Sequence, residues 1–394
     1  MQRPTAFFLK STMCRTSNGD RNTSDPRPHR HFLVTRVCMT LLALTLIVQP
    51  LQAKVISRYA YVVDPGAGQI LEYSINPTTG ALAAIKACPS TPDPHAPSAA
   101  VVDRNGGFLY VVNTAANNVW VYAINPANGC LITSPAPGEY ATGGTRPVAI
   151  DISAHDGFIA VADNGSGQLD AYLINNGILT PIAGSPFTAC ANPSAIAIDT
   201  LQSYLYITSN SSPGAICGFT FGLNKGWLSS ATNYPTTGSF PTQLAIDPVG
   251  QFLYVVNSGA DTVESYLIGT NGALTVNNTI ATGSDPRSVA VNPFGQGVYV
   301  ANNVGNSISS FQIELPPVYG ALAGNGAAVA TAGADGPTWL TVDGTGKFLY
   351  ATDSSGFVSG YSINASTGAL KPIKGSPWKT PGTGTSPAGI AIQP

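Results

Sequence analysis

One short sequence pattern recurs along this chain and limits what it can fold into. A proline begins a stretch of alternating small and apolar residues, a tight turn follows, and then comes a strand-like segment such as "FLYVVN". The prolines are spaced 45 to 51 residues apart and are Pro97, Pro147, Pro193, Pro241, Pro286, Pro337 and Pro387. A repeat of this length indicates a fold assembled from equal units, such as a propeller or a solenoid.

Each repeat also contains a third strand-like segment. An apolar residue is followed three positions later by an aromatic residue and five positions later by another apolar residue, as in Ile70, Tyr73 and Ile75. Runs of β-branched and aromatic residues bounded by Gly and Asn indicate strands rather than helices. A Gly-x-Leu turn and a weaker fourth segment follow in every copy. Each repeat is therefore predicted to be a four-stranded antiparallel meander.

An Asp or Asn ends most of the second segments, and we expect these side chains to cap the turn that follows them. They are Asp64, Asn113, Asp163, Asn257, Asn302 and Asp353.

The two ends of the repeat array indicate how it closes. The first copy begins with a second segment, "RYAYVVD", and the chain finishes with an unpaired first segment, "SPAGIAIQP". We therefore predict an all-β fold, a seven-bladed β-propeller in which the C-terminal strand is innermost in the N-terminal blade and closes the ring. An open solenoid is the alternative, but it would need a polar capping repeat at each end, and neither end differs from the rest.

Residues 1–53 lie outside the repeat and read as a leader. They hold seven of the 18 basic residues and two of the 20 acidic residues, and they include an apolar run from Val37 to Val48 followed by Ala53. That run is too short for a hydrocarbon core of about 30 Å, so a signal peptide cleaved after Ala53 is favoured. The prediction is export to the periplasm or the extracellular space, with residues 54–394 forming a single propeller domain. An uncleaved N-terminal anchor is the alternative.

Composition narrows the function of residues 54–394. They contain 11 basic and 18 acidic residues, a net charge of −7, which argues against nucleic acids and anionic membranes as partners. Only His95 and His155 remain, without a paired motif, so we expect no metal site and no cofactor. We also expect a monomer. Either disulfides or free buried thiols fit the remaining cysteines, which are Cys88, Cys130, Cys190 and Cys217.

Candidate site residues are exceptions to the repeat along the first, innermost strand. Counted from the proline, positions +3 and +5 are apolar, while positions +2 and +4 are mostly small and are expected to face the channel axis. The exceptions are Gln243 and Trp339 at +2, Asp151 and Thr341 at +4, Arg287 at +1, and Arg146 just before its proline. They predict a polar and aromatic pocket at one mouth of the channel. In the alternative, Trp339 fills the channel and the arginines pair with nearby acids such as Asp285.

These motifs, from residue 57 to residue 394, resemble the lactonase-type seven-bladed propellers, which include 6-phosphogluconolactonase-like and carboxymuconate cyclase-like proteins. They are also similar to exported Tyr-Val-Thr-Asn repeat propellers. The resemblance implies a sugar-lactone hydrolase whose proposed catalytic groups are an Arg and a His after the proline and a Glu after the second strand. Here Arg287 matches the arginine, whereas Ser288 replaces the histidine and Asn303 the glutamate.

Two functions therefore remain open. The first is an exported propeller without catalysis that binds a small polar ligand, a glycan or a protein at one mouth of its channel. The second is a 6-phosphogluconolactonase-like hydrolase of sugar lactones with a divergent active site, in which Asp151 replaces the missing base. The absent imidazole and carboxylate favour the first, because general-base catalysis contributes about 10²–10⁴-fold.

Overall fold

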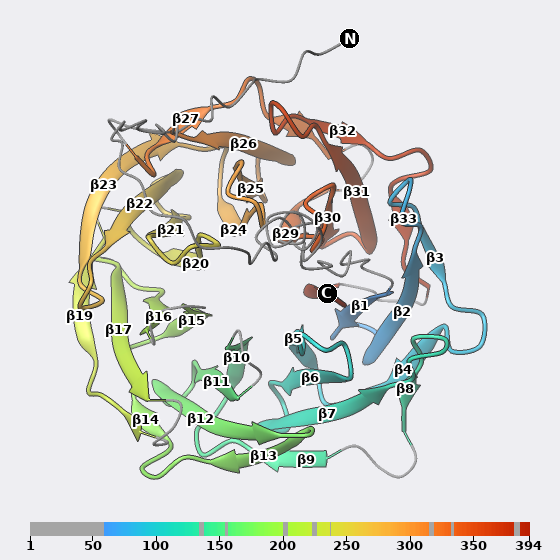
Figure 1. Cartoon of the computed structure of the whole chain (residues 1–394), viewed down its shortest axis with the longest axis horizontal. Coiled ribbons are helices and arrows are strands. Elements are labelled where there is room, and N and C mark those ends of the chain that lie inside the picture. The colour runs from blue at the N-terminus through green and yellow to red at the C-terminus, as the bar shows by residue number, and fades with distance from the viewer. Residues whose placement is uncertain are drawn as a thin grey trace, which may run out of the picture. The chain divides into compact units, whose positions relative to one another are not determined.

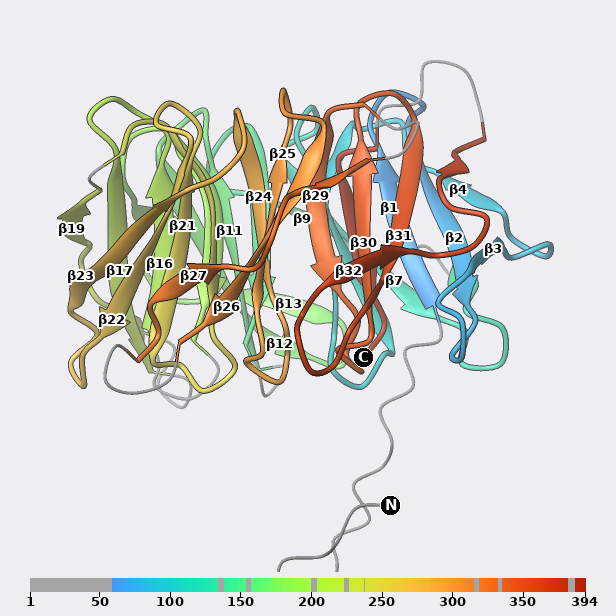
Figure 2. The same ribbon diagram turned by 90° about the horizontal axis from the view of Figure 1, so that it is seen from above.

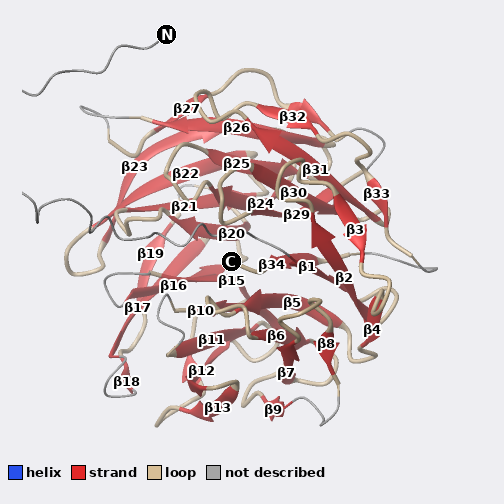
Figure 3. Ribbon diagram, turned by 45° about the vertical axis from the view of Figure 1, so that its right-hand side comes forward, coloured by secondary structure: helices blue, strands red, loops and turns tan. Residues whose placement is uncertain are grey.

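The structure is a computed structural model that describes residues 59–133, 138–153, 157–199, 204–222, 227–236, 238–314, 319–331, 335–381 and 387–394. The predicted leader and its cleavage site lie outside the described residues. Every described residue belongs to one contact unit, Lys54–Pro394. In that part of the chain, no helix is long and apolar enough to cross a membrane, and Figure 3 shows strands joined by loops.

Seven small antiparallel sheets stand in a ring, so the fold is a seven-bladed β-propeller, as predicted (Figure 1). Blade 1 consists of β34 (Gly389–Ile392), β1 (Tyr59–Asp64), β2 (Gln69–Ile75), β3 (Leu82–Ala84) and β4 (Ser90–Pro92). Blade 2 consists of β5 (Pro97–Val102), β6 (Phe108–Asn113), β7 (Asn118–Ile124), β8 (Leu131–Ile132) and β9 (Gly138–Ala141). Blade 3 consists of β10 (Pro147–Ile152), β11 (Phe158–Asp163), β12 (Gln168–Asn175), β13 (Ile178–Pro181) and β14 (Phe187–Thr188).

The remaining blades repeat this order. Blade 4 consists of β15 (Pro193–Ile198), β16 (Tyr204–Ser209), β17 (Ala215–Gly222), β18 (Trp227–Leu228) and β19 (Thr232–Pro235). Blade 5 consists of β20 (Pro241–Ile246), β21 (Phe252–Asn257), β22 (Thr262–Ile268) and β23 (Leu274–Ala281). Blade 6 consists of β24 (Pro286–Val291), β25 (Val298–Asn302), β26 (Ser307–Ile313), β27 (Leu322–Gly324) and β28 (Val329–Ala330). Blade 7 consists of β29 (Pro337–Val342), β30 (Phe348–Asp353), β31 (Phe357–Ile363), β32 (Leu370–Pro372) and β33 (Trp378–Lys379).

The four-stranded meander is confirmed, with one elaboration at the outer rim. In six blades the outermost position is divided between two short strands, both of which pair with the third strand. In blade 5 a single eight-residue strand, β23, takes that place. Short, divided edge strands offer little backbone to another chain, which limits pairing between molecules.

The ring closes as the ends of the repeat predict. The C-terminal strand β34 pairs antiparallel with β1, with Ile390 opposite Val62 and Ala391 opposite Tyr61. Ile390 is only 4% exposed because it packs in the core between blades 7 and 1. The ring is therefore held shut by one strand of hydrogen bonds and its buried side chains.

The expectation that positions +2 and +4 face the axis is wrong. Ala99 at +2 packs with Ile150 of the next blade, and Ala290 at +4 packs with Leu340 of the next blade. Each sheet has its first strand near the centre of the ring and its outer strands at the rim, as Figure 1 shows, and the strands run from one face of the ring to the other (Figure 2). Both faces of an inner strand therefore pack against neighbouring blades. These residues are small because the blades converge there.

Two disulfides join neighbouring blades. Cys88, between β3 and β4, is bonded to Cys130 of blade 2, and Cys190, which precedes β15, is bonded to Cys217 in β17. The Cα–Cα distances are 5.7 Å and 6.0 Å, within the usual range for a disulfide. Of the two possibilities that the sequence allows, free thiols are thus excluded for these four residues.

Candidate functional site

A left-handed residue before each inner strand sets the geometry of one end of the ring. The described residues in front of the inner-strand prolines all have positive φ: Ala96 at 59°, Arg146 at 53°, Asn192 at 49°, Phe240 at 52°, Asp285 at 55° and Gly336 at 69°. The carbonyl of each accepts a hydrogen bond from the residue that follows the second strand, as in Asn303 N to Asp285 O at 2.9 Å. In blades 2 to 7, this shared turn places the residue after the proline and the residue after the second strand side by side at the same end of the blade.

A cavity of about 480 Å³ lies at this mouth. Its lining comes from two repeat positions in blades 4 to 7, the residue after the proline and the residue after the second strand. The former are Ser194, Thr242, Arg287 and Thr338, and the latter are Asn210, Asn303 and Ser354. Such a volume lies within the ~300–1,000 Å³ typical of small-molecule sites.

The lining side chains also tie neighbouring blades together. The hydroxyls of Ser194 and Thr242 each donate to the proline carbonyl of the next blade at 2.9 Å, and that of Thr338 does so at 3.2 Å. The amide nitrogens of Asn210 and Asn303 donate to such carbonyls at 3.2 and 3.3 Å. Each hydroxyl has one hydrogen and two lone pairs, so a hydroxyl that donates to a proline carbonyl can still accept a hydrogen bond. Ser194 Oγ and Thr338 Oγ1 also contact Thr208 Oγ1 at 2.8 Å and Thr352 Oγ1 at 3.2 Å.

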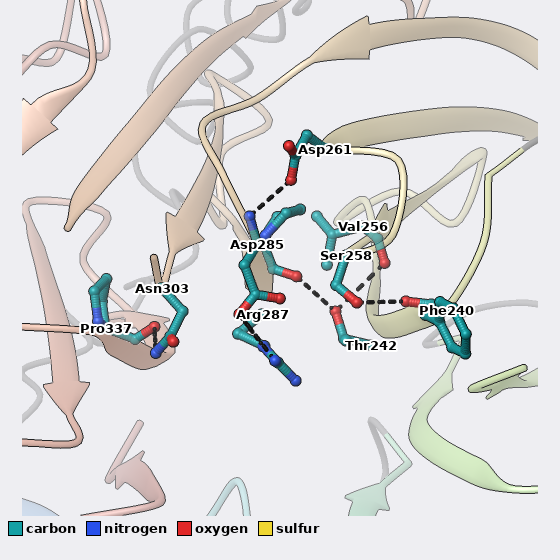
Figure 4. A network of polar contacts seen from close by, with 10 residues as sticks. Phe240, Thr242, Val256, Ser258, Asp261, Asp285, Arg287, Asn303 and Pro337 are labelled. Carbon is teal, nitrogen blue, oxygen red and sulfur yellow. Dashed lines mark hydrogen bonds and ion pairs between the residues drawn. The ribbon is translucent and has the colours of Figure 1, made fainter. Parts of the chain in front are cut away.

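Arg287 supplies the charge of the cavity. Its Nε and Nη2 donate to Asp285 Oδ2 at 2.9 and 2.8 Å, and its side chain is 48% exposed (Figure 4). A guanidinium has five N–H donors, so the groups not used by Asp285 remain for a ligand. Asp285 is itself fixed, because its backbone N donates to Asp261 Oδ1 at 2.7 Å. Arg287 therefore pairs with Asp285, as one alternative predicted, and is also exposed at the mouth, as the other predicted.

Gln243 and Trp339 lie between blades and are not among the lining residues. Gln243 is 7% exposed, and its Oε1 accepts hydrogen bonds from Ser288 Oγ at 2.6 Å and from Val289 N in the next inner strand. The half-buried Trp339 packs against the core between blades 7 and 1. In the structure, both side chains hold neighbouring blades together.

Asp151 and Arg146 also lie outside the lining. Asp151 Oδ1 accepts from its own neighbour Ile152 N at 2.8 Å, and its Oδ2 accepts from Ile198 N in blade 4 at 2.7 Å. Burial raises the pKa of Asp151 to about 6, although these backbone hydrogen bonds and the charge of Arg104 oppose the rise. Arg146 is exposed, and its backbone N donates to Asn117 Oδ1 at 2.7 Å.

The two positions where this chain departs from the lactonase motif have different surroundings. Ser288 is fully buried; its Oγ donates to Gln243 Oε1 and accepts from Leu340 N of blade 7 at 2.9 Å. Asn303, in contrast, lines the cavity. Exceptions to the repeat do not reveal the hydroxyl and amide lining, because Ser and Thr after the proline are ordinary for this repeat. The signal in the sequence that could reveal these residues is the repeat position that they share.

Two carboxyl clusters lie outside the mouth. Glu72 is the only carboxylate in the one group of potential metal ligands found among the described residues, but its partners Cys88 and Cys130 form a disulfide. Burial raises the pKa of Glu72, whose oxygens accept from Thr91 Oγ1 at 2.5 Å and Leu131 N at 2.9 Å. This cluster is therefore part of the contact between blades 1 and 2.

The second cluster is a pair of buried acids in blade 3. Burial, together with the neighbouring carboxyl of Asp170, raises the pKa of Asp163. Asp170 Oδ2 accepts from Gly143 N at 2.9 Å and Gly144 N at 3.2 Å. Among the described residues, the carboxyl of Asp170 is the one partner of the Asp163 side chain, and a protonated Asp163 can donate a hydrogen bond to it.

The expected turn caps are therefore only partly found. Asp64 Oδ1 accepts from Ala67 N at 3.1 Å, and Asp353 Oδ1 accepts from Ser355 N at 2.9 Å, as predicted. Asn302 Oδ1 instead accepts from Gly283 N at 3.0 Å, in the loop before its blade, and its Nδ2 donates to Ser307 Oγ at 3.0 Å. For Asp163 the expectation is wrong, since its neighbour is another acid.

Comparison with known proteins identifies the family. A family model described as "Lactonase, 7-bladed beta-propeller" matches residues 29–186, 179–277 and 250–316, which is more than half of the chain. The protein therefore belongs to the lactonase family of seven-bladed β-propellers. Among curated proteins, none matches this chain.

Solved structures share the fold at low sequence identity. A Bacteroides uniformis protein provisionally assigned as a 6-phosphogluconolactonase has a TM-score of 0.72 and 18% identity, over 86% of this chain and 99% of its own. A similarly assigned protein of Bacteroides fragilis has a TM-score of 0.70 and 18% identity, over 87% and 99%. The periplasmic gluconolactonase of Pseudomonas aeruginosa has a TM-score of 0.69 and 15% identity, over 86% and 99%. At these identities the likeness concerns the fold.

Proposed function

We propose that this protein is an exported member of the lactonase family that binds a small, anionic, hydroxyl-bearing molecule at the channel mouth without converting it. The exposed guanidinium of Arg287 within a cavity of hydroxyl and amide groups carries this proposal. A guanidinium binds a carboxylate through two parallel hydrogen bonds, and the surrounding oxygens accept hydrogen bonds from hydroxyl groups. No cofactor or metal is needed for such binding.

Binding without turnover follows from the chemistry of the lining. Hydroxyls, amides and a guanidinium do not accept a proton from water at neutral pH. The carboxylate beside Arg287, that of Asp285, is already paired with the guanidinium. The residue at the histidine position of the family motif, Ser288, is buried between blades and does not reach the cavity.

Hydrolysis of a sugar lactone is the second candidate. It is favoured by the family match and by the fold shared with a periplasmic gluconolactonase. In that case Asp151 is the candidate general base, because a pKa of about 6 suits proton transfer near neutral pH. Its hydrogen bonds from the backbone N–H groups of Ile152 in blade 3 and Ile198 in blade 4 oppose this role.

Binding and turnover are measured on the same purified protein. We expect calorimetry to detect gluconate binding to the wild type and to detect none with Arg287→Ala. Arg146→Ala is the matched control, since Arg146 is an exposed arginine outside the lining. Hydrolysis of gluconolactone and of its 6-phosphate should stay at the background rate. Turnover that Arg287→Ala removes would instead establish the hydrolase.

Export is the remaining part of the proposal. It is supported by the basic and apolar order of residues 1–53 and by the periplasmic location of one structural relative. N-terminal sequencing of the exported protein should begin at or within a few residues of Lys54. A leader retained on the soluble protein would contradict it.

A further inference from the structure

An exposed aromatic side chain stands on strained backbone beside the mouth cavity. Phe240 has a φ of 52° and is 44% exposed. A bulky residue in the left-handed region is a strained outlier, and such outliers are concentrated at functional sites.

The other described blades form the same turn without an aromatic residue, so the turn requires a left-handed backbone but not a phenyl side chain. At the same repeat position Asn192, Asp285 and Gly336 are of types that adopt positive φ more readily, whereas Ala96 and Arg146, like Phe240, are not, and no other described blade has an aromatic residue there. The turn itself is held by backbone, since Ser258 N donates to the carbonyl of Phe240 at 3.0 Å. The aromatic side chain therefore adds strain that the fold does not need.

The phenyl ring of Phe240 lies close to the backbone of Gly259 and next to the cavity. A Cβ atom on Gly259 would lie 2.8 Å from Phe240 Cδ2 and closer still to Ser239 Oγ, so both neighbours use the space that this glycine leaves open. Phe240 is not itself a lining residue, but it is two residues before the lining residue Thr242, whose Oγ1 donates to the carbonyl of Pro286 beside Arg287. Figure 4 shows Phe240 and Arg287 on either side of Thr242.

The groups at this mouth specify three features of a ligand. The guanidinium of Arg287 fits a carboxylate. The lone pairs of the Ser and Thr hydroxyls fit hydroxyl donors, because their own hydrogens are directed to proline carbonyls. The exposed face of Phe240 fits the apolar face of a ring.

We propose that the mouth cavity binds a hexuronic acid, a cyclic sugar with a carboxylate, whose ring stacks on Phe240. This inference rests on the proposed function and makes its ligand class specific. An open-chain sugar acid lacks the ring face, and a neutral lactone lacks the carboxylate. The sugar can be a free monosaccharide or the end of an oligouronide, since both present the same chemistry.

The test compares a cyclic and an open-chain acid by calorimetry. Wild type should bind galacturonate more tightly than gluconate. Phe240→Asn should weaken galacturonate binding about fivefold to tenfold, the effect of losing an aromatic contact, and should leave gluconate binding unchanged. Its melting temperature should stay within about 2 °C of the wild type, because Asn tolerates the left-handed region. Ala96→Asn, at the same repeat position in blade 2, is the matched control and should change neither affinity.

Each other outcome has a defined meaning. Equal affinities for the two acids, both insensitive to Phe240→Asn, would overturn the stacking role and leave the proposed function intact. If neither acid binds, the proposed function fails as well. Phe240→Leu keeps apolar bulk without a flat ring, so retention of galacturonate affinity in this folded variant would also overturn the inference. Tighter binding of digalacturonate than of galacturonate would identify an oligouronide end as the source, and equal or weaker binding a free sugar acid.

Discussion

The contacts between blades 1 and 2 and between blades 3 and 4 differ from those that border the cavity in blades 4 to 7. Each of the former contains a disulfide. The contacts that border the cavity are bridged at the mouth by hydroxyls and amides that donate to proline carbonyls. The contact between blades 3 and 4 has such a bridge too, from Asn164 Nδ2 to the carbonyl of Pro193 at 2.9 Å, so its disulfide adds a covalent bond to the shared pattern. The hydroxyl and amide groups that border the cavity, in contrast, are also lining residues. The same repeat thus gives stability in one region and a binding surface in another.

The pairing of β34 with β1 closes the ring without a covalent bond, and its loss should have the largest effect on stability. We predict that deleting residues 386–394 lowers the melting temperature by about 10 °C or more, or causes aggregation. The deletion removes the pairing of β34 with β1 and the buried side chain of Ile390. Residue 386 itself lies outside the described residues. Deleting the exposed Pro394 alone is the control, and a nonapeptide deletion that melts like the wild type would mean that β34 does not close the ring.

Removing a disulfide should have the next largest effect. The Cys88–Cys130 bond closes a loop with a sequence separation of 42, so Cys88→Ser with Cys130→Ser should cost about 3–4 kcal/mol. Denaturant melts of the oxidised proteins measure this cost. Ligand binding at the mouth should be unchanged, because none of the lining residues belongs to blades 1 and 2. A loss of ligand binding in this variant would show instead that the contact between blades 1 and 2 is coupled to the mouth cavity.

The buried acid pair in blade 3 should give a smaller, pH-dependent effect. The raised pKa of Asp163 means that its protonated form is favoured by folding, so its contribution is complete below the unfolded pKa of about 3.9 and is lost as pH rises toward the folded pKa. Asp163→Asn should therefore stabilise the protein by about 1–3 kcal/mol at pH 7 to 8 and flatten the pH dependence of its melting.

The reciprocal change in blade 6 is the matched control for the acid pair. Asn302 occupies the same repeat position, is buried, and donates to Ser307 and Ser309 Oγ at 3.0 and 2.9 Å. Asn302→Asp should destabilise the protein, more so at high pH. If Asp163→Asn destabilises instead, the two carboxyl groups do not share a proton.

The repeat predicted the fold nearly completely and the site only in part. Regular spacing reveals blade number, strand order and closure, because every blade obeys the same packing rule. Departures from the repeat were a weaker guide to function, since Gln243 and Asp151 break the pattern yet bond to inner-strand N–H groups of the next blade. Whether these two side chains face the channel or a neighbouring blade depends on how the blades pack around the axis. The residues next to them in the sequence do not reveal that packing. Arg287 differed because position +1 opens to the mouth.

Replacing Arg287 should have the smallest effect on stability. It therefore separates most sharply the contacts that stabilise the ring from the cavity that binds a ligand. Its ion pair with Asp285 has side chains that are 48% and 20% exposed, and such a pair contributes about 0–1 kcal/mol. Arg287→Ala should accordingly leave the thermal melt within about 2 °C of the wild type while removing acid binding at the mouth. Asp285→Asn is the control, because it removes the same ion pair but keeps the guanidinium, so binding should persist with a less fixed arginine. A large drop in the melting temperature of Arg287→Ala would mean that this arginine stabilises the contact between blades, as Gln243 does, and that the mouth has no dedicated charge for a ligand.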